Sequence, residues 1–221
     1  MFSKALRIPP CVLVAALLAL PAIAVQTEPA VQQKAEASPQ QEFQALLERV
    51  KKSDPAVDFG RMRQLQTQLD GYDPYGSHIE EHPSKVLSQG DLQRAKSLAE
   101  GILAENYLNL EAHIASAAVA EKKGDTAGAA HHRYVVQGVL DSIRQSGDGK
   151  TPETAFQVIA LSEEYAVMGR FGLRVAEQSL IHIGEHSYDL LKGMDPQSHA
   201  EYEVYFNIDP IMRALDKKFS Q

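Results

Sequence analysis

Two histidines, a serine, a tyrosine and two carboxylates are concentrated in the stretch HIGEHSYDLL, residues 182–191. These side chains are the types that enzymes use for nucleophilic attack, proton transfer and metal binding. The Gly-Glu pair in the stretch fits a two-residue hairpin turn, which would set His182 opposite Ser187, with Asp189 next on the same face. A candidate catalytic site on this hairpin would use His182, His186 and Asp189 as a carboxylate–histidine set of a hydrolase.

The alternative is a hairpin whose polar side chains form an ordinary solvated surface, and the sequence favours this interpretation. Alternation along paired strands puts one mostly apolar set on a single face, which we expect to face the core: Ile181, Ile183, His186, Tyr188 and Leu190. The other face, expected to be wet, carries Leu180, His182, Ser187, Asp189 and Leu191. A serine in a strand lacks the sharp strand-to-helix turn of a hydrolase nucleophile, and no oxyanion-hole segment lies nearby.

Residues 78–82 read H-x-x-E-H, a spacing that zinc hydrolases use on a helix. A metal site would need His78 and His82 on one helical face together with a third ligand. Gly76 and Pro83 leave room for little more than one helical turn, so the sequence favours an exposed loop. We therefore expect no metal and no other cofactor.

Six charged residues of the C-terminal part form a second candidate site, for a cation or a peptide amine, if strand ends bring them together. They are Asp148, Lys150, Glu163, Glu164, Asp189 and Asp209. Turn chemistry and a solvated sheet rim explain the same residues, and this second interpretation is favoured.

Residues 1–24 have the features of a secretory signal peptide. Lys4 and Arg7 precede a short apolar run, and Ala22-Ile23-Ala24 fits a cleavage site. Cleavage would remove Cys11, the single cysteine, and leave 20 basic against 29 acidic residues, a net charge of −9. We expect a periplasmic or secreted protein without a disulfide and without stable membrane insertion after cleavage. Its negative charge argues against nucleic acid as a partner.

Residues 25–41 are rich in Gln, Ala, Glu and Pro without apolar periodicity, which predicts a disordered linker. Residues 42–146 then show helical periodicity, with Asp58 as the cap of a second helix. Gly90-Asp91 recurs 34 residues later as Gly124-Asp125, which is the period of tetratricopeptide helix pairs. An antiparallel bundle in which Gly-Asp merely begins each helix fits equally well. Both alternatives predict helices over 91–105, 109–123 and 126–145.

Residues 147–221 are predicted to form a small α+β region. The apolar run 155–161 is strand-like, a helix is expected to start at 162–164, and residues 202–208 alternate as a further strand that pairs with the hairpin. Pro210 permits a last helix. The expected fold class is therefore α+β, with an N-terminal antiparallel helical region followed by a small antiparallel sheet and one or two helices.

Several short strings, taken in order and spacing, resemble the uncharacterised bacterial family known as domain of unknown function 4919. They are YDPYG at 72–76, GDGKTPETAF at 147–156, EEY at 163–165, HSYD at 186–189 and YFNID at 205–209. The resemblance spans about residues 58–212 and implies an exported bacterial protein with helices followed by a small sheet. It implies no activity. One departure is the turn at Gly184-Glu185, where Asp-Gly is expected from the resemblance.

The favoured hypothesis is an exported, non-enzymatic protein-interaction module that binds an unidentified protein or peptide partner. Shape and charge complementarity would hold the partner on an acidic surface. An aromatic groove near Tyr72, Tyr75 and Tyr107 is the predicted binding site, and alanine at these positions is expected to weaken capture of the partner. The alternative hypothesis is the hydrolase-like enzyme with the carboxylate–histidine site on the C-terminal sheet.

Overall fold

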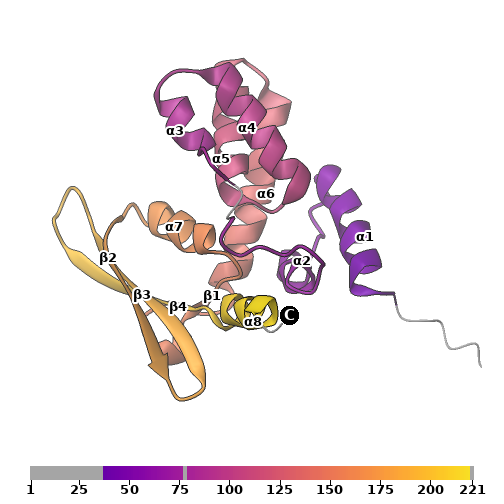
Figure 1. Cartoon of the computed structure of the whole chain (residues 1–221). Helices are drawn as coiled ribbons and strands as arrows, with labels where there is room; N and C mark the ends of the chain where they lie inside the picture. Colours follow the sequence, from indigo (N-terminus) through magenta and orange to yellow (C-terminus); the bar gives the residue numbers. More distant parts are fainter. Residues whose placement is uncertain (1–36, 77–78, 220–221) are drawn as a thin grey trace, which may run out of the picture. The chain divides into compact units, whose positions relative to one another are not determined.

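Six helices form the N-terminal part of the chain in the computed structural model, which describes residues 37–76 and 79–219. They are α1 (Pro39–Lys51), α2 (Phe59–Gln66), α3 (Pro83–Ser88), α4 (Leu92–Glu105), α5 (Leu110–Lys122) and α6 (Thr126–Arg144). The predicted signal peptide, 1–24, and most of the predicted linker lie outside the described residues. Figure 1 shows α3 to α6 side by side at one end of the molecule and α1 and α2 beside them.

The first helix begins at Pro39, three residues before the predicted start of the helical region at residue 42. Ser38 and Gln41 form a reciprocal capping box, in which each side chain accepts a hydrogen bond from the backbone N–H of the other residue. Two N–H groups at the helix start are satisfied in this way, which fixes the start of the helix. Asp58 caps α2 by accepting from the N–H of Arg61, as the sequence predicted.

The 34-residue echo in the sequence corresponds to two equivalent helix starts. Gly90 and Gly124 both have positive φ, and the aspartates that follow them, Asp91 and Asp125, cap α4 and α6. Small buried side chains, among them Ala95 at the equivalent position of Ala129, allow α4, α5 and α6 to pack closely. The three predicted helices are confirmed, whereas kinship with tetratricopeptide repeats stays a prediction. The sequence missed α3, which follows His82.

The C-terminal part holds a four-stranded mixed sheet and two helices, which confirms the α+β class. The strands β1 (Phe156–Gln157), β2 (Arg174–Ile183), β3 (His186–Met194) and β4 (Glu201–Asn207) lie in the order β1-β4-β3-β2. α7 (Leu161–Arg170) precedes β2, and α8 (Asp209–Phe219) follows β4. The predicted strand over 155–161 was too long, because only two residues pair with β4, in parallel, before α7 begins.

The predicted register of the hairpin is confirmed, with His182 opposite Ser187, but the face that was expected to be wet is partly buried. On that face Leu191 is fully buried and Asp189 nearly so, whereas Leu180 is 53% exposed. On the face that was expected to meet the core, Tyr188 is buried and Ile183 is 46% exposed. α7 packs against the face that carries Asp189. Glu164 and Tyr165 of α7 are hydrogen-bonded to Gln178 of β2, whose side chain lies on this face and also donates to Asp189. The hairpin tip extends past the helices in Figure 1, so it is wet on both faces.

A single large apolar cluster joins the helical part to the sheet. It includes Met62 of α2, Val139 of α6, Leu191 of β3 and Phe206 of β4, all fully buried. The predicted regions 42–146 and 147–221 therefore share a core. No helix within the described part of the chain is long and apolar enough to cross a bilayer.

Candidate binding cleft

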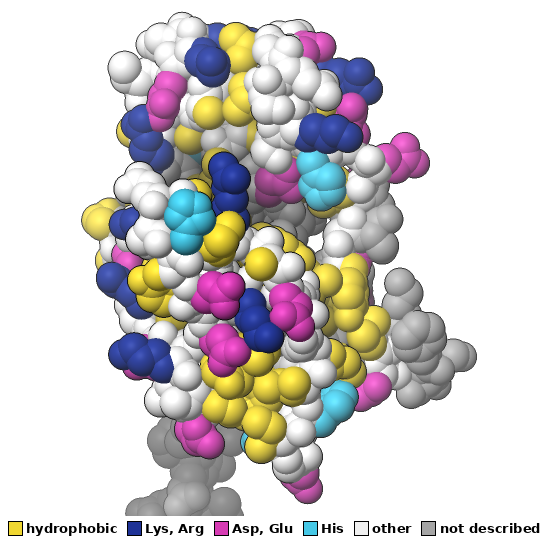
Figure 2. Space-filling view, turned by 90° about the vertical axis from the view of Figure 1, so that its left-hand side faces the viewer, with side chains coloured by type: hydrophobic (Ala, Val, Ile, Leu, Met, Phe, Trp, Pro, Cys, Tyr) yellow, Lys and Arg dark blue, Asp and Glu magenta, His cyan; other side chains and the backbone are white. Residues whose placement is uncertain are grey.

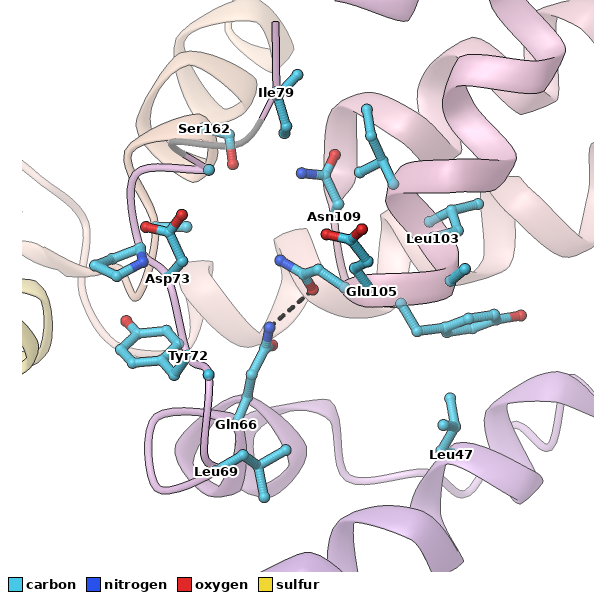
Figure 3. Close-up of a pocket in the computed structure, with 18 of the residues that line it drawn as sticks. Leu47, Gln66, Leu69, Tyr72, Asp73, Ile79, Leu103, Glu105, Asn109 and Ser162 are labelled. Atoms are coloured by element: carbon cyan, nitrogen blue, oxygen red, sulfur yellow. Dashed lines mark hydrogen bonds between the residues drawn. The ribbon is translucent and has the colours of Figure 1, made fainter.

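A cleft of about 830 Å³ lies between α1, α2 and the loop 67–76 on one side and α4 and the start of α5 on the other. We call it the tyrosine cleft, because the three tyrosines singled out from the sequence, Tyr72, Tyr75 and Tyr107, all line it. Its main apolar lining residues are Phe43, Leu47, Leu69, Ile79, Ile102 and Leu103. Figure 3 shows Leu47, Leu69 and Leu103 around the open space, with Tyr72 and Asp73 on the loop that borders it.

Internal hydrogen bonds fix two of the three tyrosines. The Tyr72 hydroxyl donates to the carbonyl oxygen of Ile159, and burial raises the pKa of the Tyr72 phenol. The Tyr107 hydroxyl lies 2.8 Å from Nε2 of His131, and burial raises its pKa as well. Tyr75 is 45% exposed, so it is the tyrosine of the cleft that is best placed to meet a bound molecule.

The loop that carries Tyr72 and Tyr75 is attached to the start of α7. The N–H of Leu161 donates to the carbonyl oxygen of Pro74 at 3.1 Å. Within the loop, the Asp73 carboxylate accepts from the N–H of Tyr75, also at 3.1 Å. The YDPYG string thus forms a turn that is anchored to the C-terminal part of the protein.

The opposite wall is fixed by amide side chains in the turn between α4 and α5. Asn106 Oδ1 accepts from Nε2 of Gln66 at 2.8 Å, a bond that spans the cleft floor in Figure 3, and from the N–H of Leu108. Asn109 caps α5 through the N–H of Ala112. The Oε1 atom of Gln66 is buried without a partner in the described structure. Amide groups on the cleft surface are suited to hydrogen-bond a peptide main chain.

The tyrosine cleft carries an excess of negative charge. Its acidic lining residues are Asp70, Asp73, Glu100, Glu105 and Glu111. Lys51 and His82 also line it, and His82 Nδ1 lies 2.8 Å from a carboxylate oxygen of Glu111. On the face drawn in Figure 2, a hollow separates the upper, helical part from the lower part, and charged and histidine side chains lie near its edges. A positively charged ligand is therefore favoured.

Next to the loop of the cleft, two carboxyl groups are buried against each other. Glu164 of α7 is fully buried and Asp189 of β3 nearly so, and their side chains are hydrogen-bonded. Burial first, then the negative charge of Asp189, raises the pKa of Glu164 to about 9, and burial raises the pKa of Asp189. Gln178 Nε2 donates to Asp189 at 2.7 Å, and its Oε1 accepts from Tyr165. We call Glu164 and Asp189 the carboxyl pair.

The geometry requires one proton within the carboxyl pair at neutral pH. Glu164 Oε1 has no hydrogen-bond donor near it in the described structure, although it is buried. A proton on Glu164 that is donated to Asp189 satisfies this oxygen and removes the repulsion of two adjacent negative charges. Burial raises the pKa of the phenols of Tyr75 and Tyr165, and the nearby negative charge of the carboxyl pair raises both pKa values further. The pair therefore ties α7 to the sheet beneath the surface.

The neighbouring carboxylate, Glu163, has a different role. The guanidinium of Arg63 in α2 donates two hydrogen bonds to the Glu163 carboxylate, from Nε to Oε1 at 3.0 Å and from Nη2 to Oε2 at 2.7 Å. Arg63 also donates to the carbonyl oxygen of Gln157, and Glu163 accepts from the N–H of Ile159. This buried ion pair joins the helical part to the C-terminal part, with four hydrogen bonds from the Arg63 guanidinium and three to the Glu163 carboxylate.

The candidate catalytic residues of the hairpin do not meet. His182 Nδ1 lies 3.0 Å from Ser187 Oγ, and both side chains lie toward the exposed tip. His186 Nδ1 lies 2.6 Å from a carboxylate oxygen of Asp209. Asp189 belongs to the carboxyl pair instead, so no Ser-His-Asp geometry is formed.

The other candidate sites are also dispersed. His78 lies outside the described residues, and His82 is the N-cap of α3 in a non-helical conformation. Asp148 accepts from Thr154 and Lys150 in its own turn, far from the acidic cluster that the sequence suggested. Within the described ranges, no group of three or more His, Cys, Asp and Glu side chains is arranged to hold a metal ion.

Sequence reasoning allowed Glu164 and Asp189 to gather with other charged residues but favoured a solvated sheet rim, whereas both carboxyl groups are buried. It missed a cluster of three histidines beside the cleft. His113 of α5 contacts His132 of α6, and His131 contacts Tyr107. Adjacent histidines at 131 and 132 were the only signal in the sequence, and they gave no reason to include His113, because the cluster depends on how α5 packs against α6.

Taken together, fold and site describe an α+β protein in which helices and a small mixed sheet share a core and border one acidic, tyrosine-lined cleft. The chain belongs to the family Domain of unknown function (DUF4919), whose family model matches residues 29–217. Three of the strings that carry the resemblance, YDPYG, EEY and HSYD, supply the loop of the cleft and the carboxyl pair. No curated protein and no solved structure matches the chain.

Proposed function

We propose that this protein is an exported, non-enzymatic binding module that holds an extended, basic peptide segment of a partner protein in the tyrosine cleft. The cleft itself is the observation that carries the proposal. Its volume of about 830 Å³ suits several residues of a peptide, and its walls combine helices with the hydrogen-bonded loop 67–76. The signal-peptide features of residues 1–24 support export.

The lining explains why an extended basic peptide is the favoured ligand. Apolar and aromatic side chains, such as Leu103 and Tyr75, provide surface for the apolar side chains of a peptide. Amides, such as Asn106, provide donors and acceptors for its main chain. Five carboxylates against one lysine favour Lys or Arg on the ligand, because complementary charge speeds association and selects partners.

The positions of the candidate catalytic residues also support a binding role, because these residues lie apart from one another. His182, His186 and Asp189 point to three different environments. The carboxyl pair is buried and outside the lining of the cleft. A ligand in the cleft would meet amides, phenols and carboxylates together with Lys51, His82 and Ser162, and among the described residues no hydrogen bond joins the Ser162 hydroxyl to a histidine.

A random peptide library displayed on phage provides the first test, with the purified protein as bait. We expect the selected peptides to combine Lys or Arg with aromatic or aliphatic residues. Their affinity, measured by calorimetry, should fall as salt concentration rises, because screening weakens the charge contacts. A selection without enrichment of basic residues would contradict the proposed ligand.

Two pairs of matched variants locate the binding. Asp70→Lys, in the cleft, should lower the affinity for the selected peptide by about tenfold, or about 1.4 kcal/mol. Glu185→Lys on the hairpin turn makes the same charge change and should leave the affinity unchanged. Tyr75→Ala should weaken binding, and Tyr202→Ala, an equally exposed tyrosine on β4, should not. Equal effects within either pair would place binding elsewhere.

A further inference from the structure

A chain of hydrogen bonds through three histidines reaches the wall of the tyrosine cleft. His113 of α5 is fully buried, and its Nε2 lies 2.7 Å from the carbonyl oxygen of Tyr107. A carbonyl oxygen only accepts, so Nε2 carries the proton and Nδ1 of neutral His113 is an acceptor. The Nδ1 of His132 lies 2.9 Å from this acceptor and must supply the proton between the two rings. We call His113, His131 and His132 the histidine cluster.

His131 extends the cluster to two other segments. Its Nε2 lies 2.8 Å from the hydroxyl of Tyr107, and its Nδ1 lies 2.8 Å from Oγ of Ser53 in the turn between α1 and α2. The rings of His131 and His132 are neighbours, with centroids 5.6 Å apart. Tyr107 is thus held twice, by His113 at its carbonyl group and by His131 at its hydroxyl.

The groups around the cluster favour neutral imidazoles. Burial lowers the pKa of all three histidines, that of His113 to about 4; His131 and His132 oppose charge on His113, and His131 opposes charge on His132. Two carboxylates, Asp125 at the start of α6 and Glu100 of α4, oppose this shift at His132 alone. The remaining titratable groups that face the cluster are the phenols of Tyr107 and Tyr134 and, beyond Tyr134, Asp54 and Arg49.

We propose that the histidine cluster is an acid-sensitive device that moves Tyr107 and so reshapes the wall of the tyrosine cleft. The geometry permits one proton between His113 and His132. A second proton, taken up at Nδ1 of His113, would set two N–H groups against each other across 2.9 Å, so one ring has to turn away. His132 is only half-buried and is free to turn toward water, which leaves His113 and Tyr107 to rearrange. As a regulator of peptide binding, the device rests on the proposed function.

The direction of the effect follows from the lowered pKa values. Histidines whose pKa is lower in the folded state stabilise the fold above the unfolded pKa of about 6.5, and this contribution is lost as pH falls toward the folded values. The arrangement of Tyr107 described above is therefore the neutral-pH state. The cluster should therefore rearrange as pH falls toward about 4, the pKa to which burial lowers His113.

Nuclear magnetic resonance of the whole protein tests the device without any peptide. His82 also borders the cleft, so both proteins should carry His82→Gln as a common background. Between pH 7.5 and pH 4, we expect the amide signals of Tyr107 and Leu108 to shift together with the imidazole signals of His113 and His132. In His132→Gln, whose amide donates to His113 without titrating, the shifts of Tyr107 and Leu108 should disappear. His182→Gln on the exposed hairpin should leave them unchanged.

Two results would overturn the device: amide signals of Tyr107 that stay fixed over this pH range, or signals that move equally in His132→Gln. Affinity for a selected peptide is a separate measurement, which should change by about tenfold if one pKa differs by one unit between free and bound protein. If Tyr107 moves but no peptide binds at any pH, the proposed function fails while the acid-sensitive device stands.

Discussion

Replacing Glu164 by glutamine should make the stability of the protein less dependent on pH. The wild-type carboxyl pair holds one proton in the folded state, because burial raises the pKa of Glu164 to about 9. The same side chain has a pKa near 4.5 when the chain is unfolded. A glutamine amide has nearly the same shape, donates to Asp189 in place of the shared proton and does not titrate.

The sign and size of the effect follow from proton linkage. Glu164 stabilises the fold fully below its unfolded pKa, and this contribution is lost as pH rises toward the folded pKa, because only the folded state retains the proton. One proton corresponds to about 1.4 kcal/mol per pH unit, and hence to about 4 kcal/mol between pH 5 and pH 8 as an upper value. Relative to wild type, Glu164→Gln should therefore gain stability steadily across this interval.

Urea unfolding of both proteins at pH 5, 6, 7 and 8 gives the required free energies of unfolding. The difference between variant and wild type is the quantity of interest, because other titrating groups cancel in it. Glu185→Gln makes the same chemical change on the exposed hairpin turn, and its difference from wild type should stay constant with pH. A constant difference for Glu164→Gln as well would refute the shared proton of the carboxyl pair.

Four further substitutions test how the elements are held together. Gly138→Ala should destabilise the protein by about 1–3 kcal/mol in thermal or urea unfolding, because the new Cβ would lie 2.2 Å from the ring of Phe59. Gly101→Ala, a helical position with no atom within 4 Å of the new Cβ, should instead stabilise it by up to about 1 kcal/mol. Arg63→Met leaves its carboxylate partner buried without a counter-charge and should cost about 3–5 kcal/mol, measured in the same way. Asp125→Ala removes the cap of α6 and should cost about 1 kcal/mol in urea unfolding.

Local signals in the sequence predicted the features that depend on neighbouring residues. Asp58, Asp91 and Asp125 were placed correctly as helix starts, because a short acidic side chain there satisfies free backbone N–H groups. The hairpin register followed from a two-residue turn, and Gly184 has the positive φ that such a turn needs. The departure from Asp-Gly at this turn did not alter the register.

Features that depend on packing between distant elements were not predicted. The apolar count of the hairpin placed Asp189 and Leu191 on a wet face, but both are buried there and Asp189 is hydrogen-bonded to Glu164 of α7, which no hydrophobic pattern indicates. The helix α3 is only six residues long and carries two buried side chains, too few for a periodic signal. The three tyrosines of the predicted groove do line one cleft, although two of them use their hydroxyls internally.

Binding in the tyrosine cleft is tested most directly by a chemical-shift map of the labelled protein during titration with a selected basic peptide. We predict that the amide signals that move will belong to both walls, above all to Asp70, Tyr75, Leu103 and Asn106. Movement confined to the exposed edge of the sheet at Leu180 and Ile183, with the signals of the cleft unchanged, would contradict the proposed binding site.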